Sequence, residues 1–269
     1  MSNGSEALAR RLRAHALRLT AAARASHIGS CLSMADMLAV LYADVLRLDP
    51  ARPDWPARDR LVVSKGHAAA VVYAALAERG FFPAEELRDY CTDGSRLAGH
   101  VTRAVPGVEI STGSLGHGLP VAAGMALAAA RAGQDWRAFC ILSDGELDEG
   151  SNWEAVQLAQ HLRLSNLVAL VDYNKIQSFG TVAEVSELDP LAAKFRAFNW
   201  GVHEIDGHDH AALRAALLGP PPLPGRPTVL VAHTVKGKGV SFMEGKLLWH
   251  YRNPDAAQLG AALAELGEA

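Results

Sequence analysis

The chain has 269 residues, of which 49% are hydrophobic and 20% charged, a composition that is typical of globular proteins and excludes disordered or collagen-like chains. Its 26 basic and 29 acidic residues give a net charge of −3, so charge gives no reason to expect a nucleic acid partner. We expect no apolar run to reach the roughly 18 residues of a membrane-spanning helix, and therefore no membrane partner.

Residues 6–24 open the chain with an arginine-rich, amphipathic pattern. Leu8, Leu12 and Leu19 fall on roughly one face of a helix. A transit peptide can have the same pattern. This segment has no apolar centre of the secretory type and runs into the next motif without a break, so we predict a structural first helix.

Short apolar, β-branched runs alternate with helical patterns along the rest of the chain. The patterns predict strands at 60–64, 138–142, 166–171 and 228–232, and helices at 68–79, 119–131 and 152–162. This alternation predicts an α/β fold with a doubly wound, mostly parallel sheet and helices on both faces. The proline-rich segment 219–227 could be a domain linker, but its length favours a surface connection within one domain.

The three cysteines lack the spacing of a metal site: Cys31, Cys91 and Cys140. Cys140 lies inside an apolar run, where a buried thiol is expected. An odd number of cysteines without such a pattern fits a reducing compartment, so we expect a cytoplasmic protein.

The strongest chemical signal is a pair of oxygen-bearing side chains one βαβ unit apart. Asp144 follows one predicted strand, and Asn174 follows the next. Because the carboxyl ends of adjacent parallel strands meet at one sheet edge, the two side chains would lie close together and could bind Mg²⁺ with phosphate and water. Gly145 would let the backbone approach a phosphate. The alternative is a helix N-cap at Asp144 and an Asx turn at Asn174, and the spacing favours the metal.

Glycine-rich turns and histidines at predicted strand ends could contact an anion. Residues 113–118 precede a helix, so their N–H groups would point at a bound phosphate. The Lys-Gly-Lys-Gly sequence at 236–239 is either a cationic turn or a plain surface loop. Five of the eleven histidines lie in such turns and could donate to a diphosphate or a sugar hydroxyl: His27, His67, His100, His117 and His250. The sequence lacks the dinucleotide, P-loop, serine hydrolase and zincin motifs.

These motifs together resemble transketolase. Ser-Asp-Gly-Glu-Leu-Asp-Glu-Gly at 143–150, with Val-Asp-Tyr-Asn-Lys at 171–175, is similar to the thiamine diphosphate motif of that family. Five further motifs occur in the family order, at 25–29, 64–67, 99–100, 112–116 and 235–239. The resemblance covers about residues 10–253 and only the N-terminal, diphosphate-binding part of the family. It implies that residues 1–269 form one diphosphate-binding (PP-type) domain, with an N-terminal helix and a C-terminal extension, and that the pyrimidine-binding domain is on a partner chain.

The resemblance implies that thiamine diphosphate is bound with a divalent cation, Mg²⁺ or else Ca²⁺ or Mn²⁺. Three oxygens would hold the cation, from the side chains of Asp144 and Asn174 and the backbone carbonyl of Ile176. Four residues would contact the cofactor, the first three at the diphosphate and the last at the thiazolium ring: His67, Gly113, Gly145 and Leu115.

The resemblance also implies which residues handle the substrate. His27, His100 and His250 would line the donor pocket. Glu149 and Glu154 match acidic residues that the family uses in a hydrogen-bond relay across the subunit interface. Three departures from the family pattern bear on donor and acceptor identity more than on cofactor binding: Ser143 for glycine, Val101 for the proline after His100, and His117 for glutamine.

The activity implied is that of a split transketolase, a transferase active only with its partner subunit. It would move a two-carbon ketol unit from a ketose or ketose phosphate to an aldehyde, in an α₂β₂ heterotetramer whose partner supplies the glutamate that activates the cofactor. One alternative is the α subunit of a 2-oxo-acid dehydrogenase E1 component. Another is a non-catalytic scaffold subunit of the same fold.

Overall fold

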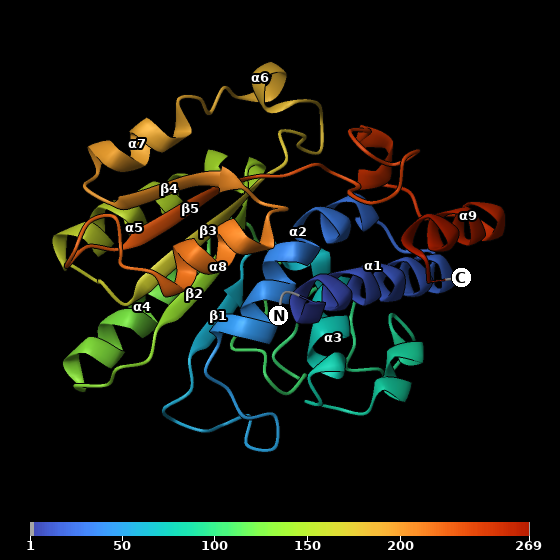
Figure 1. The fold of residues 1–269 in the computed structure, drawn as a ribbon, viewed down its shortest axis with the longest axis horizontal. Coiled ribbons are helices and arrows are strands. Elements are labelled where there is room, and N and C mark those ends of the chain that lie inside the picture. The colour runs from blue at the N-terminus through green and yellow to red at the C-terminus, as the bar shows by residue number, and fades with distance from the viewer. Residues whose placement is uncertain (1–2, 269) are drawn as a thin grey trace.

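The computed structural model describes residues 3–268 and contains one parallel sheet of five strands in that range (Figure 1). The strand order is β1-β2-β3-β5-β4, and every neighbouring pair is parallel. The strands are β1 (Arg60–Val63), β2 (Ala138–Ser143), β3 (Leu167–Tyr173), β4 (Gly201–Asp206) and β5 (Thr228–His233). All four predicted strands are therefore confirmed, and β4 is an additional edge strand.

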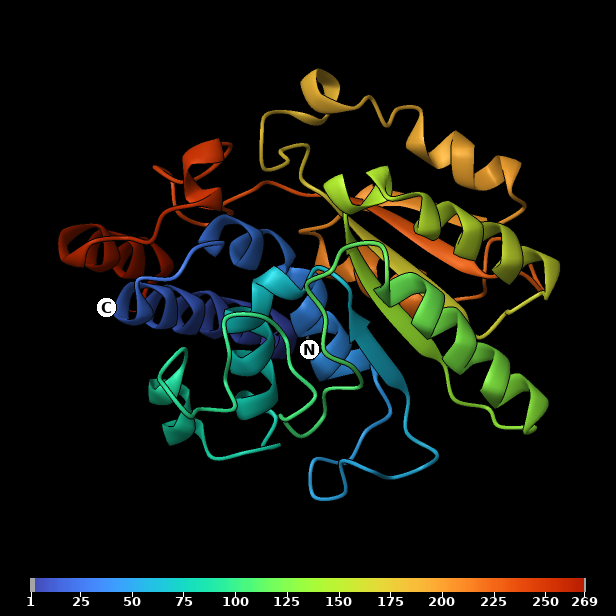
Figure 2. The ribbon, with the colours of Figure 1, turned by 180° about the vertical axis from the view of Figure 1, so that it is seen from behind.

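Helices cover both faces of this sheet, as predicted (Figures 1 and 2). One layer holds α1 (Asn3–Ala23), α2 (Ile28–Val40), α3 (Ala69–Glu78) and α8 (His210–Leu218), with α9 (Ala256–Leu266) beside α1. The other layer holds α4 (Gly118–Arg131), α5 (Gly150–His161) and α7 (Leu191–Ala197), while the short α6 (Val182–Val185) lies in the long connection after β3. Within β3, Leu170 packs into the first layer and Ala169 into the second, as expected of a strand buried on both faces.

The segment 28–45, which consists of α2 and the π-helical turn Leu41–Val45, corrects the expectation that no apolar run reaches the length of a membrane span. By length and composition alone, residues 28–45 could cross a membrane, but 89% of that window is buried inside the fold. Every residue of α2 is buried, because the helix packs against α1, α3 and α8. A helix enclosed in this way is apolar around its whole circumference, so its sequence shows no helical stripe.

The connections that position the functional residues lie at the carboxyl edge of the sheet. Ser143 at the end of β2 stands opposite Asp172 near the end of β3, so the residues that follow both strands meet there. The proline-rich segment 219–227 joins α8 to β5 on the surface, as expected of a connection within one unit.

Candidate functional site

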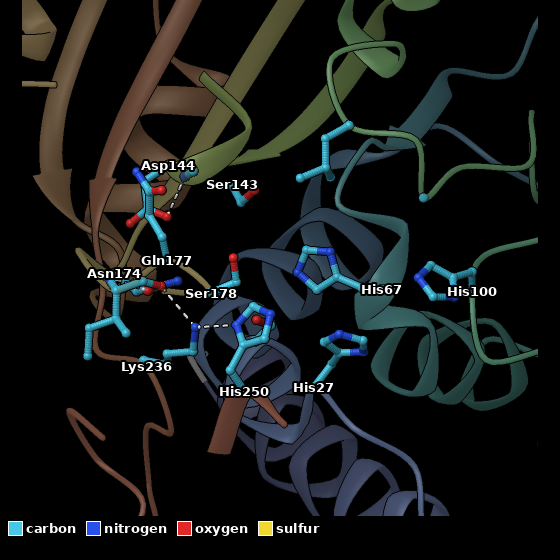
Figure 3. A pocket seen from close by; sticks show the side chains of 15 residues that line it. His27, His67, His100, Ser143, Asp144, Asn174, Gln177, Ser178, Lys236 and His250 are labelled. Carbon is cyan, nitrogen blue, oxygen red and sulfur yellow. Dashed lines mark hydrogen bonds between the residues drawn. The ribbon is translucent and has the colours of Figure 1, made fainter. Parts of the chain in front are cut away.

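A cavity of about 240 Å³ lies at the carboxyl edge of the sheet (Figure 3). Ten of the twelve predicted site residues line it: His27, His67, His100, Gly113, Leu115, Asp144, Gly145, Asn174, Ile176 and His250. Five further residues complete the lining: Ser30, Ser143, Gln177, Ser178 and Lys236. Segments separated by more than two hundred residues thus meet around one space.

Asp144 and Asn174 lie side by side in this cavity. The carboxylate of Asp144 accepts hydrogen bonds from the N–H of Gly145 at 2.8 Å and from the N–H of Lys175 at 2.6 Å. The side-chain oxygen of Asn174 accepts from the N–H of Ile176 at 3.1 Å. The N-cap bond at Asp144 and the Asx-turn bond at Asn174 are therefore both present. The bond from Lys175 to Asp144 shows in addition that the ends of β2 and β3 are adjacent.

The charge environment of Asp144 favours a bound cation. Burial, and next the nearby carboxylate of Asp172, raise the pKa of Asp144 to about 6. A divalent cation would offset both costs. Among residues 3–268 no group of three or more His, Cys, Asp or Glu side chains is arranged to hold a metal ion. A cation at Asp144 would therefore complete its shell with oxygens from Asn174, a backbone carbonyl, phosphate and water, which is the donor set that suits Mg²⁺.

The cavity wall offers one free donor to an anion, and its packing requires a glycine at position 113. The side-chain nitrogen of Gln177 is buried and has no hydrogen-bond partner in the structure, so a donor is free to meet an anion. Gly113 has φ +142°, and a Cβ there would lie 2.7 Å from the ring of His100. Only glycine allows the chain to pass this point without pushing that ring aside.

Four histidines form a cluster at the other end of the cavity from Asp144 (Figure 3). The ring of His27 lies 5.0 Å from that of His67, 5.1 Å from that of His250 and 5.9 Å from that of His100, measured between centroids. Burial is the main cause that lowers the pKa of His27 to about 4 and the pKa of His250 to about 3. Both rings are therefore neutral at pH 7, with one nitrogen that donates and one that accepts.

Lys236 is a functional candidate that sequence patterns left open. Its side chain is almost fully buried, and its ammonium donates to the carbonyl of Ile176 at 2.9 Å and to Nδ1 of His250 at 2.8 Å. Burial, and next the charge of Lys65, lower the pKa of Lys236 to about 8. The cationic turn is thus the correct interpretation for Lys236, whereas Lys238 lies nearer the surface, 3.8 Å from Glu244. The signal in the sequence that could have identified Lys236 was its position in the loop that follows β5.

A second buried cation supports the floor of the cavity. Lys65 forms a fully buried ion pair with Asp172, whose carboxylate also accepts hydrogen bonds from the hydroxyls of Ser33 and Thr234. The ammonium of Lys65 donates further to the carbonyl of Ser30 at 3.2 Å. This network joins the segment after β1, α2, β3 and the segment after β5, so it fixes the elements that carry the cavity residues.

The structure does not bring Glu149 and Glu154 to the cavity. Both are exposed, and Glu154 lines a separate hollow on α4 and α5 together with His117. Glu149 precedes α5, and Glu154 lies on the outer side of that helix. Their position on the surface leaves them accessible to another subunit but not to a ligand in the cavity.

Comparisons with known proteins identify the family to which the chain belongs. Residues 5–267 match the family model described as transketolase, thiamine diphosphate binding domain. The chain is 43% identical over 241 residues to a 6-deoxy-6-sulfo-D-fructose transketolase subunit from Clostridium sp. (strain MSTE9), and the match covers 89% of this chain and 88% of that one. It is 40% identical over 246 residues to an apulose-4-phosphate transketolase subunit from Phocaeicola vulgatus, covering 91% and 88%.

Solved structures give the same assignment. Transketolase from Leishmania mexicana superposes with a TM-score of 0.92 at 33% identity, covering 98% of this chain and 41% of that one. Transketolase from Campylobacter jejuni gives a TM-score of 0.89 at 30% identity, covering 99% and 42%. The chain thus spans about two fifths of these solved transketolases. By sequence and by fold, the chain belongs to the transketolase family of transferases, within its thiamine diphosphate binding domain.

Proposed function

We propose that the chain is the cofactor-binding subunit of a split transketolase, which transfers a two-carbon ketol unit from a ketose or ketose phosphate to an aldehyde. The observation that carries this proposal is the single cavity in which Asp144 and Asn174 stand at one end and neutral histidines at the other. The split arrangement is supported by relatives that are named as transketolase subunits and match this chain over 88% of their length.

At one end of the cavity, the chain would hold thiamine diphosphate and its cation. Asp144, Asn174 and the carbonyl of Ile176 would ligate Mg²⁺, and the ammonium of Lys236 would share that carbonyl, which has two lone pairs. The free donor of Gln177 would face the diphosphate. When bound, the cofactor supplies a carbon nucleophile for cleavage beside the ketose carbonyl.

At the other end, the histidines would hold the sugar. A neutral imidazole can donate to a carbonyl oxygen through one nitrogen and accept a hydroxyl proton at the other. His27 and His250 are neutral because they are buried, and His100 is exposed at the cavity rim. We assign to them the orientation of the ketose and the proton movements at its oxygens.

A partner subunit would complete the site. Asp144 is the only acid among the residues that line the cavity in the described part of the chain. With that carboxylate occupied by the cation, the glutamate that the resemblance requires at the pyrimidine ring would come from the partner. Two copies of each chain would follow if sites form between subunits, and Glu149 and Glu154 would then face the interface.

The proposal is tested by calorimetry on the full chain together with a candidate partner chain that carries a pyrimidine-binding domain. We expect thiamine diphosphate to bind only when Mg²⁺ is present, and the loaded complex to consume a ketose phosphate but not a 2-oxo acid. Failure to bind the cofactor with Mg²⁺ present would contradict the proposal and leave a scaffold subunit. Consumption of the 2-oxo acid instead would identify an E1 component.

A further inference from the structure

Glu146 is a fully buried carboxylate that has no role in the function described so far. It lies in the short 3-10 turn Gly145–Asp148, two residues after Asp144, and its side chain points away from solvent. One carboxylate oxygen accepts the N–H of Gly116 at 2.8 Å and the hydroxyl of Ser64. Within residues 3–268 it forms no ion pair, so these hydrogen bonds must offset the cost of burying it.

The partners of Glu146 belong to the glycine-rich loop 113–118 and to its support. The N–H of Gly118 donates to the hydroxyl oxygen of Ser64 at 3.0 Å, and the carbonyl of Gly116 accepts from the hydroxyl of Ser151 at 2.7 Å. Gly116 has φ +83°, and a Cβ there would lie 2.5 Å from the Ser151 hydroxyl oxygen. The second half of the loop is therefore clamped from several sides, and Glu146 provides the only charged contact with its backbone among the described residues.

The first half of the same loop reaches the cavity. Gly113 and Leu115 line it, whereas Gly116 is held outside by Glu146. Glu146 follows β2 in the same turn as Asp144. Its carboxylate thus links the turn at the cation end of the cavity to the glycine-rich loop, because one oxygen accepts both the N–H of Gly116 and the hydroxyl of Ser64.

We propose that Glu146 is a positioning residue that holds the loop 113–118 against the end of β2, so that Gly113 and Leu115 meet bound thiamine diphosphate. This inference rests on the proposed function, because it assumes that the cavity takes this cofactor. Glu146 itself touches neither cofactor nor substrate.

Two substitutions of Glu146 separate positioning from general stability. Glu146→Ala removes the acceptor and leaves the N–H of Gly116 unpaired, so we expect the Kd for thiamine diphosphate to rise at least about tenfold. Amide hydrogen exchange across 113–118 should accelerate by a similar factor. Glu146→Gln keeps an oxygen for Gly116 and Ser64, so both quantities should stay within about threefold of wild type. Ser64→Ala removes the hydroxyl that bonds both Glu146 and the N–H of Gly118, so it tests the same link if Glu146→Ala does not fold.

The control is Leu213→Ala, which shortens a fully buried side chain on α8. This helix covers the face of the sheet opposite to that covered by α4 and α5. It should lower the melting temperature without weakening cofactor binding or loosening 113–118. The inference is overturned if Glu146→Ala keeps wild-type affinity and exchange, or if Leu213→Ala weakens binding equally for an equal loss of melting temperature. Wild-type protein that binds no thiamine diphosphate with Mg²⁺ would instead refute the proposed function, while the exchange measurement would still decide whether Glu146 holds the loop.

Discussion

Replacing Asp144 with alanine should abolish Mg²⁺-dependent binding of thiamine diphosphate by the assembled enzyme and raise the Kd at least about a hundredfold. Mutation of residues that only hydrogen-bond to metal ligands already lowers metal affinity or activity roughly 10–100-fold, and loss of a ligand should cost more. Asp144 is the only carboxylate in the cavity lining of the described residues, and the nearby Asp172 is held in its ion pair with Lys65, so no other acid is placed to replace it. The measurement is a titration of thiamine diphosphate at fixed Mg²⁺, compared with a titration in the presence of a chelator.

Asp144→Asn is the matched control for the charge. It keeps the size of the side chain and one oxygen for the N–H of Gly145 or Lys175. Burying an ionised carboxylate next to Asp172 is costly in the metal-free chain, as the raised pKa of Asp144 reflects. The metal-free Asn variant should therefore unfold at or above the wild-type temperature while cofactor binding is lost. A Kd close to that of wild type in either variant would contradict the cation assignment.

Replacing His100 with alanine should lower kcat/KM for the ketose donor by about 100-fold or more, the usual effect of removing a group that moves protons or bonds the reacting oxygen. The Kd for thiamine diphosphate should remain within about twofold, because His100 lies at the end of the cavity remote from Asp144 (Figure 3). His100 is exposed, so its loss should not unfold the chain. Steady-state kinetics with varied donor, together with cofactor titration, separate the two effects.

His117→Ala serves as the control for His100. It removes another exposed histidine, whose ring contacts the carbonyl of Leu115 at 3.0 Å but does not line the cavity. Its donor kinetics should stay close to wild type. Equal losses in both variants, or a weakened cofactor Kd in His100→Ala alone, would exclude the assignment of His100 to the donor.

The regular part of the fold could be predicted because its strands carry an unambiguous pattern. β2 and β3 are short, apolar and bounded by turn residues, and the crossover between them fixes their parallel alignment. That alignment alone brings Asp144 and Asn174 together, so the proximity of the proposed ligands needs no further tertiary information. The edge strand β4, Gly-Val-His-Glu-Ile-Asp, was missed because half of its side chains are polar and at least partly exposed.

The rest of the site depends on turns whose geometry no spacing rule fixes. Glu146, Asp148 and Glu149 form one acidic stretch, yet only Glu146 turns inward, because the 3-10 turn at 145–148 directs it toward Gly116. Lys236 and Gln177 likewise reach the cavity from loops after strands. Their residue types alone favour a solvated surface, and only the folded chain shows the buried positions that they occupy.

The most direct test of the split-transketolase account is a ketol transfer assay on the chain alone, on its partner alone and on the two combined, each with thiamine diphosphate and Mg²⁺. The account predicts that neither chain alone transfers the two-carbon unit from a ketose phosphate to an aldehyde, and that the mixture does. Sustained transfer by this chain in the absence of any partner would contradict it.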